Sequence, residues 1–231
     1  MSGHIGIVAV SPEGAAVCYR QIFRHASRMM PTTRHPRVTI HNELLADYIE
    51  ATRNQDWHRV AGLLSMSANL LADAGAEFCL TPDNAVLYGV QLAESSSRIP
   101  WVTAPDIVAD AVQRDGRKKV GIVGTKMVTQ GSAYQTILGL RGVHVSAPSP
   151  ADSLALDRII FEELIYGTSR AESRQFVREI FVRLGESGCE AVILAWSESP
   201  LLVNEETSEL PVYDAADLLA RGAVVRSMGS A

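Results

Sequence analysis

Short, largely apolar segments recur along the whole chain and are separated by longer amphipathic segments. The apolar segments are residues 5–10, 37–40, 77–80, 101–103, 119–123, 143–146 and 191–195. Most of them lack a strict alternation of apolar and polar residues, which is typical of parallel strands that are covered on both faces. Apolar residues recur at three- and four-residue spacing in segments 56–74 and 171–184, as on one face of a helix. This strand–helix alternation predicts an α/β fold with parallel sheets.

One arrangement of strands and turns occurs twice. Gly6 lies in the first strand, and 77 residues later Asp83 lies in a polar turn after another strand. Gly121 and Trp196 repeat this arrangement at a separation of 75 residues. We therefore expect two pseudo-twofold-related Rossmann-like lobes whose polar turns face one cleft, because ligands of parallel sheets bind beyond the carboxyl ends of the strands. Two lobes that share this spacing by chance are the alternative interpretation. The expected lobes comprise residues 1–98 with 209–231, and residues 99–208.

The composition argues against several classes of partner. Of the 231 residues, 47% are hydrophobic and 20% charged, which predicts a buried core rather than disorder. The net charge of −5 and the lack of a long basic run argue against nucleic acid and acidic membrane surfaces as partners. No apolar segment approaches the ~20 residues of a membrane span, and a strand pattern begins where a secretory leader would lie. The three scattered cysteines lack metal-type spacing. We therefore expect a cytoplasmic protein without a metal site.

Six segments match, in order, the motifs of one protein family. They are PEGAAVCYRQI at 12–22, AGAEF at 74–78, VGIVGTK at 120–126, IIFEEL at 159–164, the segment 188–202, and PVYD at 211–214. On these segments the chain resembles the aspartate/glutamate racemase superfamily. This group includes aspartate, glutamate and hydantoin racemases, arylmalonate decarboxylase and maleate isomerase. The resemblance covers nearly the whole chain. It implies a fold of two Rossmann-like lobes, a homodimer, and an enzyme that needs neither a metal nor pyridoxal phosphate.

The two catalytic cysteines of the family are replaced in this chain. In the family, one thiolate removes the α-proton of the substrate and the other thiol reprotonates the opposite face. Asp83 occupies the position of the first cysteine and Trp196 that of the second. Because an indole N–H is neither an acid nor a base near pH 7, two-thiol racemisation is excluded at these positions. The cysteines at 18, 79 and 189 map to a helix, a strand interior and a strand start, where we expect small buried hydrophobic side chains.

Asp83 is therefore the candidate general base. A carboxylate can accept or deliver a proton, orient a water molecule or attack as a nucleophile, and desolvation by Trp196 could raise its pKa. Ordinary capping of a helix is the alternative, and the residues support both interpretations equally. Glu198 matches a family glutamate after the second turn, where it would orient reacting groups or simply stand at a helix N-terminus.

The substrate-binding part of the family site is better retained. The family holds the substrate carboxylate with an asparagine, hydroxyl groups and strand-end amides. No arginine occurs in segment 41–44 to bind a second carboxylate, so a monocarboxylate fits as well as aspartate or glutamate. His41 ends a strand, where it could be an acid or base or an ordinary surface histidine. The candidate substrate-binding residues are Ser11, His41, Asn42, Asn84, Thr125 and Ser197.

Two functions of different class remain open. The first is a cofactor-independent isomerase, lyase, decarboxylase or hydrolase that acts on a small carboxylate by one-sided proton transfer or water activation, with Asp83 as base. The second is a catalytically silent protein that binds small carboxylates. Retention of Asn84, Ser197 and Glu198, together with a carboxylate at 83, favours the enzyme.

Overall fold

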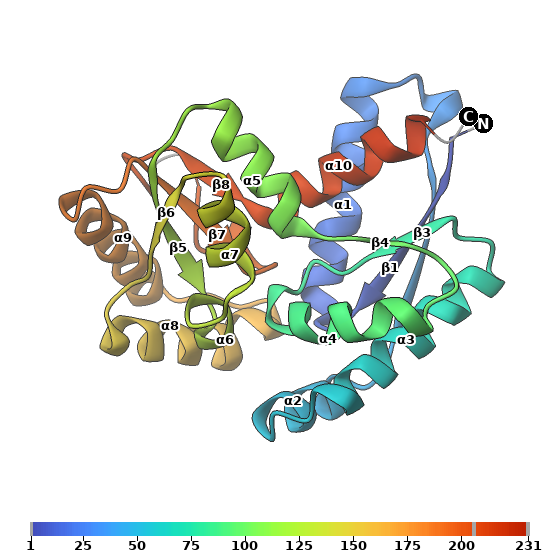
Figure 1. Ribbon diagram of the computed structural model, residues 1–231, viewed down its shortest axis with the longest axis horizontal. Coiled ribbons are helices and arrows are strands. Elements are labelled where there is room, and N and C mark those ends of the chain that lie inside the picture. The colour runs from blue at the N-terminus through green and yellow to red at the C-terminus, as the bar shows by residue number, and fades with distance from the viewer. Residues whose placement is uncertain (1, 205–206, 230–231) are drawn as a thin grey trace. The chain divides into compact units, whose positions relative to one another are not determined.

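Two four-stranded parallel sheets form the framework of the computed structural model, which describes residues 2–204 and 207–229. Each sheet belongs to one of two units (Figure 1). Unit 1 comprises Met1–Thr103 and Leu219–Ala231, and unit 2 comprises Ala104–Leu218. The strand orders are β2-β1-β3-β4 in unit 1 and β6-β5-β7-β8 in unit 2, so both sheets have the same topology. The predicted α/β class with parallel sheets is confirmed.

Unit 1 alternates strands and helices as the sequence predicts. Its strands are β1 (His4–Ala9), β2 (Arg37–Asn42), β3 (Phe78–Leu80) and β4 (Trp101–Val102). Its helices are α1 (Pro12–Met29), α2 (Leu45–Arg53), α3 (Trp57–Asp73), α4 (Leu87–Ala93) and most of α10 (Ala215–Gly229). Short 3-10 turns are η1 (Thr32–Arg34), η2 (Asn84–Val86) and η3 (Glu94–Ser96).

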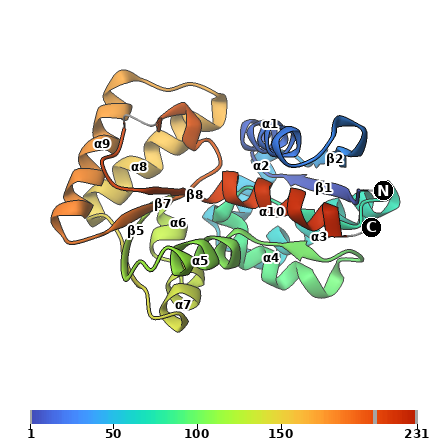
Figure 2. The same ribbon diagram turned by 90° about the horizontal axis from the view of Figure 1, so that it is seen from above.

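Strand β1 lies at the centre of unit 1. All of its residues are buried, because α1 covers one side of the strand and α3 the other (Figure 2). Glycine at position 6 permits this packing, since a Cβ atom there would lie 3.1 Å from Leu71 Cδ1 of α3. Helix α1 begins at Ser11, whose Oγ accepts a hydrogen bond from the Gly14 N–H at 3.1 Å. The carboxyl end of β1 therefore leads directly into a capped helix.

Unit 2 repeats the alternation. Its strands are β5 (Lys119–Gly124), β6 (His144–Ser146), β7 (Ala191–Ala195) and β8 (Val212–Asp214). Its helices are α5 (Ala104–Arg114), α6 (Lys126–Thr129), α7 (Ala133–Leu140), α8 (Pro150–Glu162) and α9 (Ala171–Glu186), and the first residues of α10 also belong to it. The 3-10 turns are η4 (Leu164–Tyr166) and η5 (Ser199–Leu201). Of the helices in the described residues, none is long and apolar enough to cross a membrane.

The paired strands β5 and β7 form the buried centre of unit 2. Their register places Gly124 opposite Ala195. A Cβ atom on Gly124 would lie only 2.8 Å from the Ala195 carbonyl oxygen, so only glycine allows the two strand ends to lie this close together. Thr125 and Trp196, the next residues along the two strands, therefore leave the sheet side by side.

Candidate functional site

Asp83 lies in the turn after β3 and is held by the loop after β1. Its Oδ2 accepts a hydrogen bond from the Ser11 N–H at 3.1 Å, and its own N–H donates to Thr81 Oγ1 at 3.4 Å. Asp83 stands at the N-cap position of η2, but its side chain makes no capping hydrogen bond to that turn. The capping interpretation is therefore wrong for this side chain. The half-buried carboxylate is turned toward the main chain of a neighbouring strand end.

The other candidate residues of unit 1 surround the carboxyl ends of the same sheet. Ser11 is buried, and its hydroxyl is occupied as the cap of α1. Asn84 is also buried, and its Nδ2 donates to the Pro82 carbonyl at 3.3 Å. Asn42 ends β2 and is exposed. Together with Asp83 and His41, these residues are called the unit 1 cluster below.

The His41 side chain is partly exposed and contacts two polar side chains of unit 1. Its Nδ1 lies 3.0 Å from Ser67 Oγ of α3, and its Nε2 lies 3.8 Å from Glu43 Oε1. Ser67 is fully buried, whereas the His41 side chain is 29% exposed. No local pattern predicts the Ser67 contact, because the two residues are 26 positions apart and meet only when α3 packs on β2.

Thr125 and Trp196 are buried hydrogen-bonding groups at adjacent strand ends in unit 2. Thr125 is 4% and Trp196 is 2% exposed. Among the described residues, neither Thr125 Oγ1 nor Trp196 Nε1 has a hydrogen-bond partner. A buried polar group without a partner costs about 1–3 kcal/mol, so such groups are rare without a functional reason. Carboxyl ends of parallel strands are where ligands bind, and both groups can donate a hydrogen bond there.

Ser197 and Glu198 follow Trp196 and are buried as a hydrogen-bonded pair. The Ser197 hydroxyl donates to Glu198 Oε2 at 3.0 Å, and the two residues are 1% and 2% exposed. Glu198 stands at the N-cap position of η5 without a side-chain capping bond to it. Thr125, Trp196, Ser197 and Glu198 are called the unit 2 cluster below.

A buried carboxyl group that sequence analysis did not assign lies at the end of β8. Asp214 accepts hydrogen bonds from the Ser199 hydroxyl at 2.6 Å and from the Ala216 and Asp217 N–H groups at 2.9 and 3.0 Å. Burial raises the pKa of Asp214, although these hydrogen bonds oppose the shift. Burial and the charge of Asp214 also raise the pKa of Tyr134. Asp214 thus anchors the start of α10 to the turn that carries Glu198.

The cysteines should play no part in turnover. Cys18, Cys79 and Cys189 are all buried, as predicted, and burial raises the pKa of the Cys79 thiol to about 12. Because the thiolate is the reactive form, we expect any activity to survive treatment with iodoacetamide. Turnover is measured after alkylation, and a thermal unfolding curve checks that the fold is intact. Lost turnover in a folded, alkylated protein would contradict this prediction.

Within residues 2–204 and 207–229, no three His, Cys, Asp or Glu side chains are grouped to hold a metal ion.

The fold and the two clusters define an α/β protein with polar side chains in the turns after its strands. Two of these side chains, Thr125 and Trp196, have no hydrogen-bond partner among the described residues. Residues 7–223 match the family described as Asp/Glu/Hydantoin racemase, and the chain belongs to this family. It is similar to a candidate Asp/Glu racemase from Yersinia pestis, with 26% identity, a TM-score of 0.86, and 98% of this chain and 99% of that chain covered. An aspartate racemase homologue from Pyrococcus horikoshii OT3 shows 25% identity, a TM-score of 0.81 and coverage of 97% and 99%.

A more distant neighbour shares the fold. Glutamate racemase from Francisella tularensis, in complex with D-glutamate, is 13% identical to this chain. The TM-score is 0.73, and the match covers 99% of this chain and 82% of that chain. The family resemblance expected from the six sequence motifs is thus confirmed.

Proposed function

We propose that this protein is a cofactor-independent enzyme that acts on a small carboxylate or amino-acid-like substrate, with Asp83 as general base. The observation that carries the proposal is the half-buried Asp83 carboxylate, which accepts a hydrogen bond from the Ser11 N–H. Trp196, at the position of the family's second cysteine, offers only a neutral indole N–H. Proton transfer by one carboxylate therefore suits this chain better than exchange between two thiols.

Asp83 is suited to accept a proton from a substrate carbon or from water. The Ser11 N–H donates a hydrogen bond to the Asp83 carboxylate at 3.1 Å. This bond also fixes the orientation of the carboxylate, as a general base requires. The reaction is then an isomerisation, elimination, decarboxylation or hydrolysis rather than a two-thiol racemisation.

The unit 2 cluster supports binding of the substrate carboxylate. Thr125 and Trp196 are two donors that a carboxylate oxygen can satisfy, and hydrogen bonds to a charged partner are stronger than neutral ones. Neither donor carries a charge, which favours a small monocarboxylate or amino-acid-like group over a ligand that needs a cationic clamp.

A panel of small carboxylates tests the proposal directly. In deuterium oxide, NMR spectra would show exchange at the carbon next to the carboxylate, or formation of a product, for a substrate of this enzyme.

Trp196 favours one second candidate function, a catalytically silent protein that binds small carboxylates, because it places an inert indole where the family has a catalytic thiol. Saturation-transfer signals without exchange or product would support that candidate instead.

The Thr125→Val variant should bind the carboxylate less tightly without loss of stability. Valine retains the volume of threonine but removes the unpartnered hydroxyl, so we expect an affinity loss of about 1.5–3 kcal/mol, or about ten- to a hundredfold in Kd. The free energy of unfolding should stay constant or rise, because no hydrogen bond of the free protein is lost. Calorimetric titration measures the affinity, and urea denaturation measures the stability.

Thr129→Val is the matched control for this variant. Thr129 is equally buried, but its hydroxyl donates to the Lys126 carbonyl at 3.3 Å. Its removal should therefore lower stability and leave affinity unchanged. If both variants bind the ligand like the unmodified protein, Thr125 is not a ligand-binding residue.

A further inference from the structure

One segment of unit 1 carries basic side chains and no acidic ones. Residues 14–42 contain neither aspartate nor glutamate, but they include five arginines. The rest of the chain has 16 lysines and arginines against 26 aspartates and glutamates. The segment therefore has the opposite net charge to the remainder of the molecule. Its arginines are Arg20, Arg24, Arg28, Arg34 and Arg37.

Three of these arginines form a row along α1. Arg20, Arg24 and Arg28 are exposed and lie four residues apart in this helix. They therefore share one face of α1, at intervals of about 6 Å along its axis. Val17 and Ile22 belong to the buried face of the same helix, which contacts β1. The row is thus a solvent-facing surface of the folded unit.

The other two arginines belong to the segment that follows α1. The Phe23 ring of α1 packs against the His35 ring, with the ring centroids 6.0 Å apart. This contact brings the segment that carries Arg34 and Arg37 back to the side of the helix. Both of these arginines are exposed. The five arginines are called the arginine surface below.

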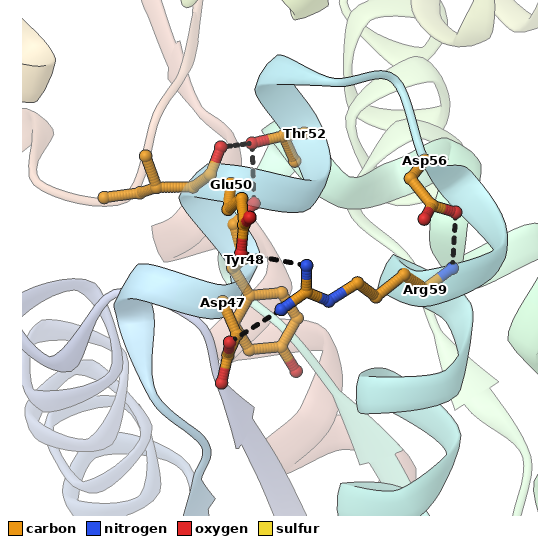
Figure 3. Close-up of polar contacts among 7 residues, drawn as sticks. Asp47, Tyr48, Glu50, Thr52, Asp56 and Arg59 are labelled. Atoms are coloured by element: carbon orange, nitrogen blue, oxygen red, sulfur yellow. Dashed lines mark hydrogen bonds and ion pairs between the residues drawn. The ribbon is translucent and has the colours of Figure 1, made fainter.

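Several exposed arginines elsewhere in the protein are held by carboxylates. Arg59 of α3 donates from Nη1 to Glu50 Oε2 at 2.9 Å and from Nη2 to Asp47 Oδ1 at 2.8 Å (Figure 3). Arg98 Nη2 lies 2.8 Å from Asp73 Oδ1. Among the residues that the structure describes, no side chain of the arginine surface forms an ion pair or a hydrogen bond. Its guanidinium groups can therefore bind an anion from outside the chain.

An exposed aromatic side chain adjoins the row on α1. Tyr19 is 40% exposed, and the centroid of its ring lies 4.9 Å from that of Phe23. This ring contact orients Tyr19 next to Arg20. Tyrosine and arginine are enriched in protein–protein interfaces, because both bury a large area and still form hydrogen bonds. The surface thus has the composition of a protein interface.

The dimensions of the row favour a short acidic segment over an extended polyanion. From Arg20 to Arg28 the row spans only about 12 Å. Duplex DNA carries one negative charge per about 1.7 Å and continues beyond such a row, where it would meet the excess negative charge of the remaining residues. A short segment with carboxylates about 6 Å apart, as on one face of an acidic helix, would contact the row alone.

We propose that the arginine surface binds an acidic segment of a partner protein. Each guanidinium can hold a carboxylate through two parallel N–H bonds. The surface is distinct from the unit 1 cluster, because the row begins in the middle of α1 and runs toward its end, whereas Ser11 precedes the helix. This interaction is therefore independent of the proposed function, and its test does not require a substrate.

Fluorescence anisotropy with a labelled synthetic peptide tests this proposal. The peptide is helical, carries glutamate at every fourth position and contains no basic residue. In the variant Arg20→Gln, Arg24→Gln, Arg28→Gln, the Kd of the peptide should rise about tenfold, because three individually weak ion pairs are lost together. The affinity of the unmodified protein should fall as the salt concentration rises. Urea denaturation should show unchanged stability, since these side chains make no bond in the free protein.

The variant Arg59→Gln, Arg98→Gln, Arg141→Gln is the matched control. It removes the same charge from arginines that already bind carboxylates, so the peptide should bind it like the unmodified protein. If the peptide does not bind the unmodified protein, or if both variants lose the same affinity, the proposal is wrong. Tighter binding of a single-stranded oligonucleotide of equal charge, or of vesicles of anionic lipid, would also overturn it, because the preferred partner would then not be an acidic protein segment.

Discussion

Replacing Asp83 by asparagine should reduce turnover by about 10²–10⁴-fold, the usual effect of losing a general base. Asparagine keeps the shape of the side chain, and its carbonyl oxygen can still accept the bond from the Ser11 N–H. The titratable group is lost, whereas ligand binding, which does not need a titrating group at position 83, should persist. Steady-state turnover and ligand titration on the same preparation separate these two effects.

Asp56→Asn is the control for an aspartate that only caps a helix. Asp56 precedes α3, and its Oδ1 accepts a hydrogen bond from the Arg59 N–H at 3.0 Å. Asparagine caps a helix about as well as aspartate, so this variant should keep both its stability and its activity. Near-normal turnover of Asp83→Asn would show that Asp83 is not the base.

The purified protein should not interconvert the enantiomers of aspartate or glutamate at an enzymatic rate. Racemisation needs a proton donor and acceptor on opposite faces of the α-carbon, and Trp196 offers only a neutral indole N–H. The loss of one acid–base partner typically costs about 10²–10⁴-fold in rate. Chiral chromatography of each pure enantiomer after long incubation measures the result.

A racemase of the family that retains both cysteines serves as the positive control for that assay. Rapid interconversion by the present protein would contradict the prediction. Glu198, which is buried beside Ser197, or His41 would then have to act as the second acid–base group.

The elements of the fold could be predicted because they depend on local patterns. Segment 191–195 is apolar throughout and forms β7 with those bounds. Segment 56–74 shows helical spacing, and α3 occupies Trp57–Asp73 within it, with Asp56 as its cap. The largest deviation at a strand end is in β2, which is expected at 37–40 and extends to Asn42, because its last two residues pair with Val8 and Ala9 of β1 although they are polar.

The placement of the candidate residues at strand ends could be predicted from the motifs, but their hydrogen bonding could not. Ser11 and Asp83 are 72 residues apart, and their bond exists only because β1 and β3 are neighbours in the sheet. Whether a hydroxyl or an indole N–H has a partner depends on all the atoms around it. The unsatisfied groups of Thr125 and Trp196 therefore leave no trace in a single sequence.

The contact between Ser11 and Asp83 has a consequence for how this protein can change during evolution. The hydroxyl of Ser11 stabilises α1, whereas the group that orients Asp83 is the backbone N–H of the same residue. Substitution by alanine would weaken the helix cap by about 1 kcal/mol and keep the donor that faces the carboxylate. Only proline would remove that donor. Selection on the side chain at position 11 can therefore change the stability of the protein. The orientation of the Asp83 carboxylate is unaffected, because it depends on the main chain.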